Sequence, residues 1–168
     1  MITYNHEQYL ADAIQGVLNQ LCDFKFELII GEDCSQDNTR QIALDYAKQY
    51  PDIIRVVYSD KNVGMNANSR RIFDRAKGKY IAYCEGDDFW TDSNKLQIQF
   101  NYMENNSGCK LCIHDAFFIT ADEKITFNSK PLSKNPINYG IEDAIMGIGI
   151  KVATNSFFYT SEIVKKPM

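Results

Sequence analysis

The sequence lacks both a long apolar run and an excess of positive charge. No stretch reaches the roughly 18 apolar residues that a membrane-spanning helix needs, and no basic start followed by an apolar run marks a signal peptide. The net charge is −4, which argues against a nucleic-acid partner because such proteins present a basic face. The composition predicts a cytoplasmic location, with peripheral attachment at the inner face of the membrane as the alternative.

Three phosphate-binding or nucleophile motifs are also missing. The sequence contains no G-x-G-x-x-G and no G-x-x-x-x-G-K-[ST], so the phosphate loops of dinucleotide-binding and P-loop proteins are absent. It contains no G-x-S-x-G, which weakens a hydrolase interpretation of an α/β sheet. The five cysteines form no paired framework, and Cys109 and Cys112, near His114, lack the second pair that a zinc site would need. We therefore expect reduced, buried thiols.

What the sequence does contain is an alternation of strands and helices. Ile2 is typical of the end of a first strand. Strands are expected at 26–30, 53–59 and 79–84, and helices at 9–20, 36–50, 66–76 and 93–105. Such alternation predicts an α/β fold, a three-layer αβα sandwich with a mainly parallel sheet. Later residues predict a hairpin of 110–120 with 124–128, a short helix at 141–146 and a strand at 154–159.

Three polar segments follow strands of the predicted sheet: residues 3–6, 32–35 and 85–88. In parallel sheets ligands bind beyond the carboxyl ends of the strands, so we expect these segments to share one crevice. The adjacent carboxylates Asp87 and Asp88 cannot both ionise cheaply without a nearby cation, which Mg²⁺ or Mn²⁺ would supply. The alternative is a solvated turn.

The other two segments each allow two interpretations. Asp33 could accept hydrogen bonds from a base or a ribose, while Ser35 caps the next helix. Tyr4 could stack on a nucleobase or belong to the core. His6 is expected to be a polar loop residue without a catalytic role, and the adjacent Arg70 and Arg71 to form a solvated helix face.

Taken together, these motifs resemble family 2 glycosyltransferases with the GT-A (Rossmann-like) fold. The resemblance covers about residues 1–115 and rests on four motifs in order: 3–10 (TYNHEQYL), 31–39 (GEDCSQDNT), 78–82 (GKYIA) and 85–90 (EGDDFW). The spacing of Asn62 and Gly64 and the segment 92–96 (DSNKL) also fit. It implies one domain, with 1–110 as the nucleotide-sugar-binding half and 111–168 as part of the acceptor-side half.

The resemblance also implies roles for individual residues. Asp88, in a DXD-like motif, would bind Mn²⁺ or Mg²⁺ between the diphosphate oxygens. The nucleotide, most commonly a UDP sugar, would be held by five residues: Thr3, Tyr4, Glu7, Asp33 and Asp87. Such enzymes are typically inverting, and a carboxylate base deprotonates the hydroxyl of a glycan or lipid-linked acceptor. The full-length parent would then build a bacterial surface polysaccharide or a similar glycan.

The sequence departs from the family pattern at both ends. The catalytic base is unknown and expected beyond Met168, with Glu142 and Asp143 as possible substitutes, and most of the first strand is missing. We therefore expect a truncated piece of a longer enzyme. Two further hypotheses stay open: a non-catalytic module that binds nucleotide sugars, and a nucleotidyltransferase, which would need a basic cluster for its triphosphate.

Overall fold

Strands and helices alternate through the first part of the chain, as the sequence predicts. The computed structural model describes residues 1–120, 124–128 and 153–165. The first eight elements are β1 (Ile2–Thr3), α1 (Leu10–Leu18), β2 (Leu28–Glu32), α2 (Thr39–Gln49), β3 (Ile54–Tyr58), α3 (Met65–Phe73), β4 (Tyr80–Ala82) and α4 (Lys95–Asn105). Each expected strand and helix is present, with boundaries shifted by a few residues.

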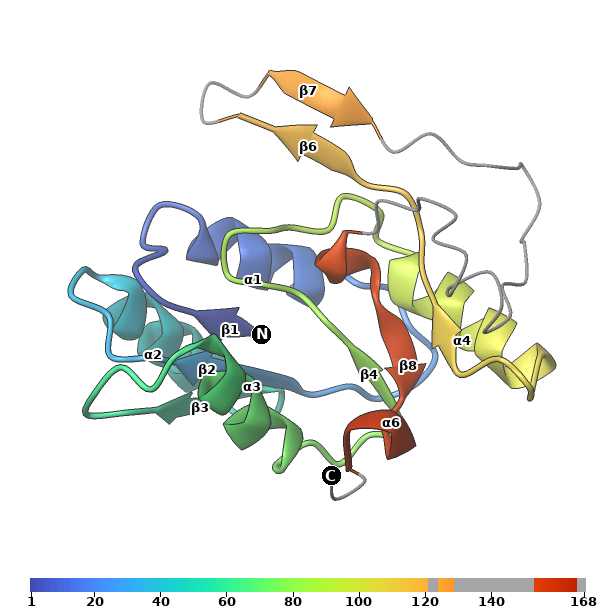
Figure 1. Ribbon diagram of the computed structural model, residues 1–168, viewed down its shortest axis with the longest axis horizontal. Helices are drawn as coiled ribbons and strands as arrows, with labels where there is room; N and C mark the ends of the chain where they lie inside the picture. Colours follow the sequence, from blue (N-terminus) through green and yellow to red (C-terminus); the bar gives the residue numbers. More distant parts are fainter. Residues whose placement is uncertain (121–123, 129–152, 166–168) are drawn as a thin grey trace.

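The later elements differ more from the prediction. They are β5 (Leu111–Cys112), β6 (Phe117–Ile119), β7 (Ile125–Asn128), the 3₁₀ helix η1 (Thr154–Ser156), β8 (Phe158–Thr160) and α6 (Glu162–Lys165). The long strand expected at 110–120 is two strands, of which β5 joins the main sheet and β6 pairs with β7 as the expected hairpin. Figure 1 shows this hairpin projecting from the body. The expected helix at 141–146 lies outside the described residues.

The main sheet is mostly parallel and its strand order reverses beside β1. β1, β2 and β3 pair in parallel, and an isolated parallel bridge joins Ile2 to Glu85, just after β4. β8 inserts antiparallel between β4 and β5. Through that bridge the two three-stranded sheets, β1-β2-β3 and β4-β8-β5, continue one another in the order β3-β2-β1-β4-β8-β5, so that β2 and β3 lie on one side of β1 and β4 lies on the other. In open α/β sheets such a reversal marks the place where ligands bind, and here it lies at the carboxyl ends of β1 and β4, where we expect a crevice.

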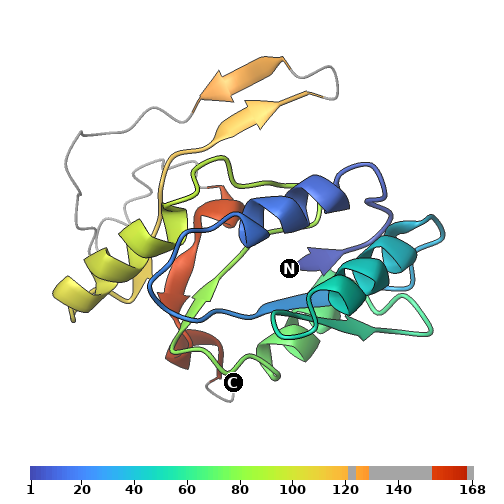
Figure 2. The same ribbon diagram turned by 180° about the vertical axis from the view of Figure 1, so that it is seen from behind.

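Helices cover both faces of this sheet, which confirms the three layers. On one face, Leu28 and Ile30 of β2 pack in a core with residues of α1, α2 and α4. On the other face, Ile29 packs against Ile72 of α3. Neighbouring strand residues point to opposite faces of the sheet. A strand that is buried on both faces therefore has a continuous run of apolar residues in the sequence. Figures 1 and 2 show α1 and α3 on opposite sides of β1 and β2.

The chain that follows residues 85–88, the acidic segment, is held against α1 by backbone contact and by Gln20. A Cβ atom at Gly16 of α1 would lie 2.9 Å from the carbonyl oxygen of Trp90. The Gln20 side chain donates to Asp92 O at 2.8 Å and accepts the N–H of Leu96 at 3.0 Å. These contacts fix where the acidic segment leaves the sheet.

We expect Gly16→Ala to lower the free energy of unfolding by about 1–2 kcal/mol, because overpacking outweighs the helix propensity of alanine. The added methyl would press on backbone atoms of Trp90, which cannot rotate away as a side chain can. Gly108→Ala is the matched control, since a Cβ there would meet nothing within 4 Å. Urea unfolding of both variants measures the difference, and equal stabilities would refute the close packing.

Candidate functional site

Backbone hydrogen bonds bring the three polar segments together at the carboxyl ends of β1, β2 and β4. Thr3 pairs with Glu32 in the β1–β2 register, and the N–H of Asp33 donates to the carbonyl of Thr3 at 3.1 Å. On the other side, the N–H of Gly86 donates to the carbonyl of Ile2 at 2.9 Å. The three segments inferred to share one edge of the sheet therefore do lie together, with β1 at their centre.

The loops after β1 and β2 brace each other through reciprocal hydrogen bonds. The N–H of Asn5 donates to Ser35 Oγ at 3.0 Å, and Asn5 Oδ1 accepts the N–H of Gln36 at 2.8 Å. The Glu7 carboxylate accepts the N–H of Asn38 at 2.9 Å. The prediction that Ser35 caps the following helix is wrong, because α2 begins at residue 39 and Ser35 Oγ is used by Asn5.

Two residues of these loops adopt left-handed backbone conformations. The φ angles are 55° for Asn5 and 63° for Cys34, in a region that residues with a Cβ adopt at some cost. Asn5 takes part in the reciprocal hydrogen bonds, and Cys34 directly precedes Ser35, which also does. Backbone strain of this kind gathers at functional sites.

Asp33 lies at the end of β2 with both carboxylate oxygens engaged. Oδ1 accepts the N–H of Val63 at 2.9 Å and Oδ2 accepts the N–H of Gly64 at 2.8 Å. The guanidinium of Arg71 lies 3.7 Å from Oδ1. Asp33 thus anchors the loop between β3 and α3, a role that its position after an apolar strand did not reveal.

Thr3 and His6 lie beside Gly86, and Tyr4 follows Thr3 in the same segment. Tyr4 is 38% exposed, which leaves its ring available for stacking. Thr3 Oγ1 and His6 Nδ1 are buried without a hydrogen-bond partner in the described part of the chain. Both face Gly86, where an added Cβ would lie 2.6 Å from Thr3 Oγ1 and 2.9 Å from His6 Nδ1. Only glycine fits there, and two polar atoms remain unsatisfied at the site.

The acidic segment carries three carboxylates with little compensating charge. Burial, with smaller contributions from the charges of Asp87 and Glu85, raises the pKa of Asp88 to about 6. Glu85 accepts a hydrogen bond from Thr154 Oγ1 at 2.7 Å, and Asp87 lies 3.8 Å from His6 Nε2. Among the described residues, no hydrogen bond or ion pair involves the Asp88 carboxylate. It is therefore the group of this segment that most favours a cation.

The acidic segment fits a divalent cation that shares its coordination with a bound ligand. Among residues 1–120, 124–128 and 153–165, no three histidine, cysteine or acidic side chains gather as a ready-made metal cage. Mg²⁺ characteristically needs only one or two carboxylates when ligand phosphates complete its shell. A half-buried, unpaired Asp88 beside two further carboxylates meets that requirement.

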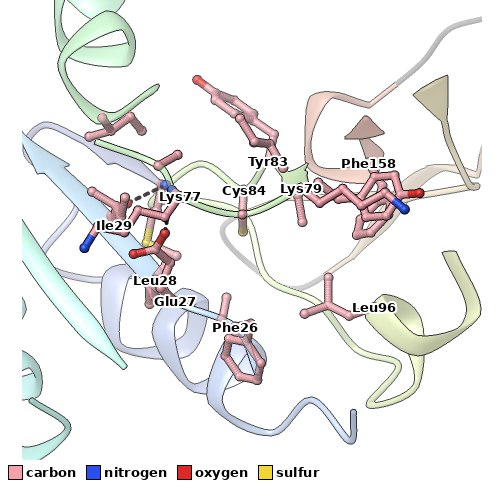
Figure 3. Close-up of a pocket in the computed structure, with 18 of the residues that line it drawn as sticks. Phe26, Glu27, Leu28, Ile29, Lys77, Lys79, Tyr83, Cys84, Leu96 and Phe158 are labelled. Carbon is pink, nitrogen blue, oxygen red and sulfur yellow. Dashed lines mark hydrogen bonds between the residues drawn. The ribbon is translucent and has the colours of Figure 1, made fainter. Parts of the chain in front are cut away.

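A separate cavity of about 490 Å³ lies between β2 and β4 (Figure 3). Its walls are mainly apolar, with Leu28, Ile29 and Phe158 among them, and Lys77 N–H bonds to Glu27 at 2.8 Å near its edge. None of the six predicted site residues lines it. The crevice is the better candidate site, because convergent polar groups rather than volume alone define a binding site.

Sequence reasoning missed the place of Arg71. It was expected on a solvated helix face, yet its side chain is only 23% exposed and lies beside Asp33. Arg70 does point outward and pairs with Asp74. The one available signal was the spacing of Asn68 and Arg71, which places them on the same face of α3. Glu142 and Asp143, named as substitute bases, lie outside the described residues.

Comparison with known proteins now identifies the family. The family model described as "Glycosyl transferase family 2" matches residues 1–161. The chain belongs to glycosyl transferase family 2. An uncharacterized Mycobacterium tuberculosis protein, Rv1520, is 37% identical over 79% of this chain, and the match spans 38% of that relative. TuaG of Bacillus subtilis, named a putative teichuronic acid biosynthesis glycosyltransferase, is 34% identical over 75% of this chain and 53% of its own length.

Solved structures of glycosyltransferases share the fold. S. aureus TarS, crystallised with UDP, has a TM-score of 0.69 at 18% identity, covering 98% of this chain and 46% of that one. A mannosyltransferase of Pyrobaculum calidifontis has a TM-score of 0.58 at 17% identity, covering 66% of this chain and 32% of that one. The GT-A-like fold is thereby confirmed. This family 2 chain spans about half or less of each of these proteins, and no helix in its described part is long and apolar enough to cross a membrane.

Asp88→Asn should raise the free energy of unfolding at pH 7.5 by about 1–2 kcal/mol in chelator-treated buffer, after allowance for solvent screening. Because the folded-state pKa of Asp88 is raised to about 6 from 3.8, ionisation of this carboxyl destabilises the fold increasingly between pH 4 and pH 6. The gain should therefore vanish near pH 4. Asp52→Asn, at an exposed turn, is the control. A gain independent of pH would contradict the burial of an unpaired charge.

Proposed function

We propose that the crevice binds a nucleotide sugar for transfer to a hydroxyl acceptor. The observation that carries this proposal is the partly buried Asp88 carboxylate, which lies at the point where the strand order reverses. Within the described residues, no cationic side chain pairs with it. An unpaired charge at such a position costs stability, and a ligand that brings a cation with it removes that cost. A diphosphate with a divalent metal is such a ligand.

In the proposed complex, the two sides of the crevice hold different parts of the donor. The Tyr4 ring stacks on the base, Asp33 accepts a hydrogen bond from the base, and Thr3 and Glu7 lie close by. Asp87 contacts the ribose or supports the metal, and Asp88 binds Mn²⁺ or Mg²⁺. Thr3 Oγ1 and His6 Nδ1 are unsatisfied in the described part of the chain, and a ligand at this point would supply partners for them.

The titles of the similar structures support a nucleotide-sugar donor, and those of TarS favour a UDP-linked one. TarS has been crystallised with UDP and with UDP-GlcNAc, and the Pyrobaculum enzyme with GDP-Man and Mn²⁺. TuaG is named for teichuronic acid biosynthesis. We therefore propose a UDP sugar as donor, a divalent metal as cofactor and a surface glycan as the product of the whole protein.

The chemistry proposed for the whole protein is inverting transfer. A base removes the proton from an acceptor hydroxyl, and the oxygen attacks the anomeric carbon as the bond to the diphosphate breaks. A bound metal would act as a Lewis acid that stabilises the departing diphosphate. In this proposal the crevice residues bind and orient the donor. The base is proposed to lie outside the described residues.

Calorimetric titration of UDP in the presence of Mn²⁺ tests the donor site. We expect Asp88→Ala to weaken UDP binding about tenfold or more, because charge-assisted contacts typically contribute about 1.5–3 kcal/mol. Without Mn²⁺, the wild type should bind UDP weakly and the variant no more weakly, because Asp88→Ala removes a carboxylate that repels the diphosphate. Asp52→Ala, remote from the crevice, should behave as wild type. If Asp88→Ala bound UDP with Mn²⁺ as tightly as wild type, the metal assignment would be wrong.

Turnover separates an enzyme from a binding module. The same protein is incubated with UDP-GlcNAc, Mn²⁺ and a glycan acceptor, and released UDP is measured. Release that depends on both the acceptor and Asp88 would support transfer by this chain. Tight binding without release would favour the non-catalytic module.

A further inference from the structure

The 3₁₀ helix η1 is attached to both ends of the acidic segment by hydrogen bonds. At the start of the segment, Thr154 Oγ1 donates to Glu85 Oε2 at 2.7 Å. Just beyond its end, the indole N–H of Trp90 donates to the carbonyl of Asn155 at 2.9 Å. The partners are 65 or more residues apart in the sequence, so only the tertiary structure brings them together.

Buried contacts hold η1 in place without help from the Thr154 side chain. Ser156 is fully buried, and its carbonyl accepts the side-chain amide of Gln99 at 2.9 Å. Gln99 in turn accepts Lys95 Nζ at 2.8 Å, and this ammonium lies 4.0 Å from the centre of the Trp90 ring. Breaking these contacts would leave buried polar groups unpaired, which is costly. Loss of the exposed Thr154 hydroxyl should therefore leave η1 where it is.

Among the described residues, Glu85 is the only member of the acidic segment whose carboxylate accepts a hydrogen bond. The Asp87 carboxylate has only the approach of His6 Nε2 at 3.8 Å. The N–H of Asp88 donates to the carbonyl of Glu85 at 3.2 Å, in a turn that brings the carboxylates close together. Burial is the main cause of the raised pKa of Asp88, and the charges of Asp87 and Glu85 add to it. Glu85 thus lies within electrostatic reach of Asp88.

A glutamate next to two other carboxylates would not keep this place unaided. Its side chain is flexible, and the neighbouring negative charges favour conformations that point away from them into water. A metal that uses such a carboxylate would have to order the side chain as it binds, and the lost rotamer freedom would weaken binding. The Thr154 hydroxyl holds Oε2 of Glu85 and leaves Oε1 without a hydrogen bond from the described residues. The carboxylate is thereby ordered in advance and still open to a cation.

We infer that Thr154 is a positioning residue that holds Glu85 beside Asp88, so that the acidic segment presents an ordered set of carboxylates to a metal-bound diphosphate. This inference rests on the proposed function, because it takes the acidic segment as the place where the metal and the diphosphate bind. Thr154 acts through Glu85 and has no part in the transfer chemistry. It belongs to the part of the chain expected to form the acceptor-side half, so a side chain of that half orders the donor site.

Calorimetric titration of UDP with and without Mn²⁺ tests this role in Thr154→Val, which keeps the shape of the side chain but cannot donate. We expect the gain in UDP affinity that Mn²⁺ brings to fall about fivefold, because Glu85 must then be ordered as the metal binds. Without Mn²⁺, Thr154→Val should bind UDP no more weakly than wild type. Thr154→Ser keeps the hydroxyl and should stay within about twofold of wild type. Thr91→Val is the matched control, because Thr91 is exposed and makes no hydrogen bond within the described chain.

A double-mutant cycle with Glu85→Ala separates positioning from a structural effect. If Thr154 acts through Glu85, Thr154→Val should cause no further loss of Mn²⁺-dependent affinity when Glu85 is already alanine. Circular dichroism confirms that each variant is folded. An unchanged gain from Mn²⁺ in Thr154→Val, additive losses in the double variant, or equal losses with and without Mn²⁺ would each overturn the inference. Absence of UDP binding by the wild type would instead refute the proposed function, so the two failures are distinguishable.

Discussion

The two residues of β1 hold the candidate site together. Ile2 and Thr3 pair in parallel with β2 on one side, and Ile2 bridges to Glu85 on the other. Every polar segment of the crevice is positioned relative to these two residues, because each follows β1 or a strand that lies next to it. The reversal of strand order beside β1 separates the loops that leave β1 and β4, and the crevice opens between them.

The distribution of compensating charge divides this crevice into two halves. On the β2 side, burial works to raise the pKa of Glu32, but hydrogen bonds from Ser35 and Arg40 outweigh it and lower this pKa overall. Asp33 next to it is held by two backbone N–H groups and by Arg71. On the β4 side, burial raises the pKa of Asp88, and no cation contacts it in the described chain. The carboxylates on the β2 side thus have their partners within the described protein. On the β4 side, a cation brought by a ligand would stabilise the Asp88 carboxylate.

This division supports the proposed roles of the two halves. A base is neutral and needs shaped hydrogen-bonding groups, which the braced loops and the clamped Asp33 supply. A diphosphate is strongly anionic and cannot approach three carboxylates unless a metal lies between them. Under the proposed function, the pre-organised half would therefore hold the base and the electrostatically unbalanced half would hold the diphosphate.

Much of the architecture could be predicted because it depends on local patterns. Apolar runs and helical periodicity predicted the strands and helices through α4, and their alternation predicted the parallel sheet. The details of the later elements were less accessible, as the division of 110–120 into β5 and β6 shows. Short strands leave little periodicity to detect, and β5 exists because β8, more than 40 residues later, pairs with it.

The family, the order of elements and the three polar segments could all be read from the amino-acid sequence, because motifs and strand ends are local properties. What the individual side chains do depended on the folded chain. The Glu7 and Ser35 side chains brace loops that lie about 30 residues apart, Arg71 turns inward to Asp33, and His6 joins the crevice. These roles depend on which donors meet which acceptors across the crevice, and only folding brings those partners together.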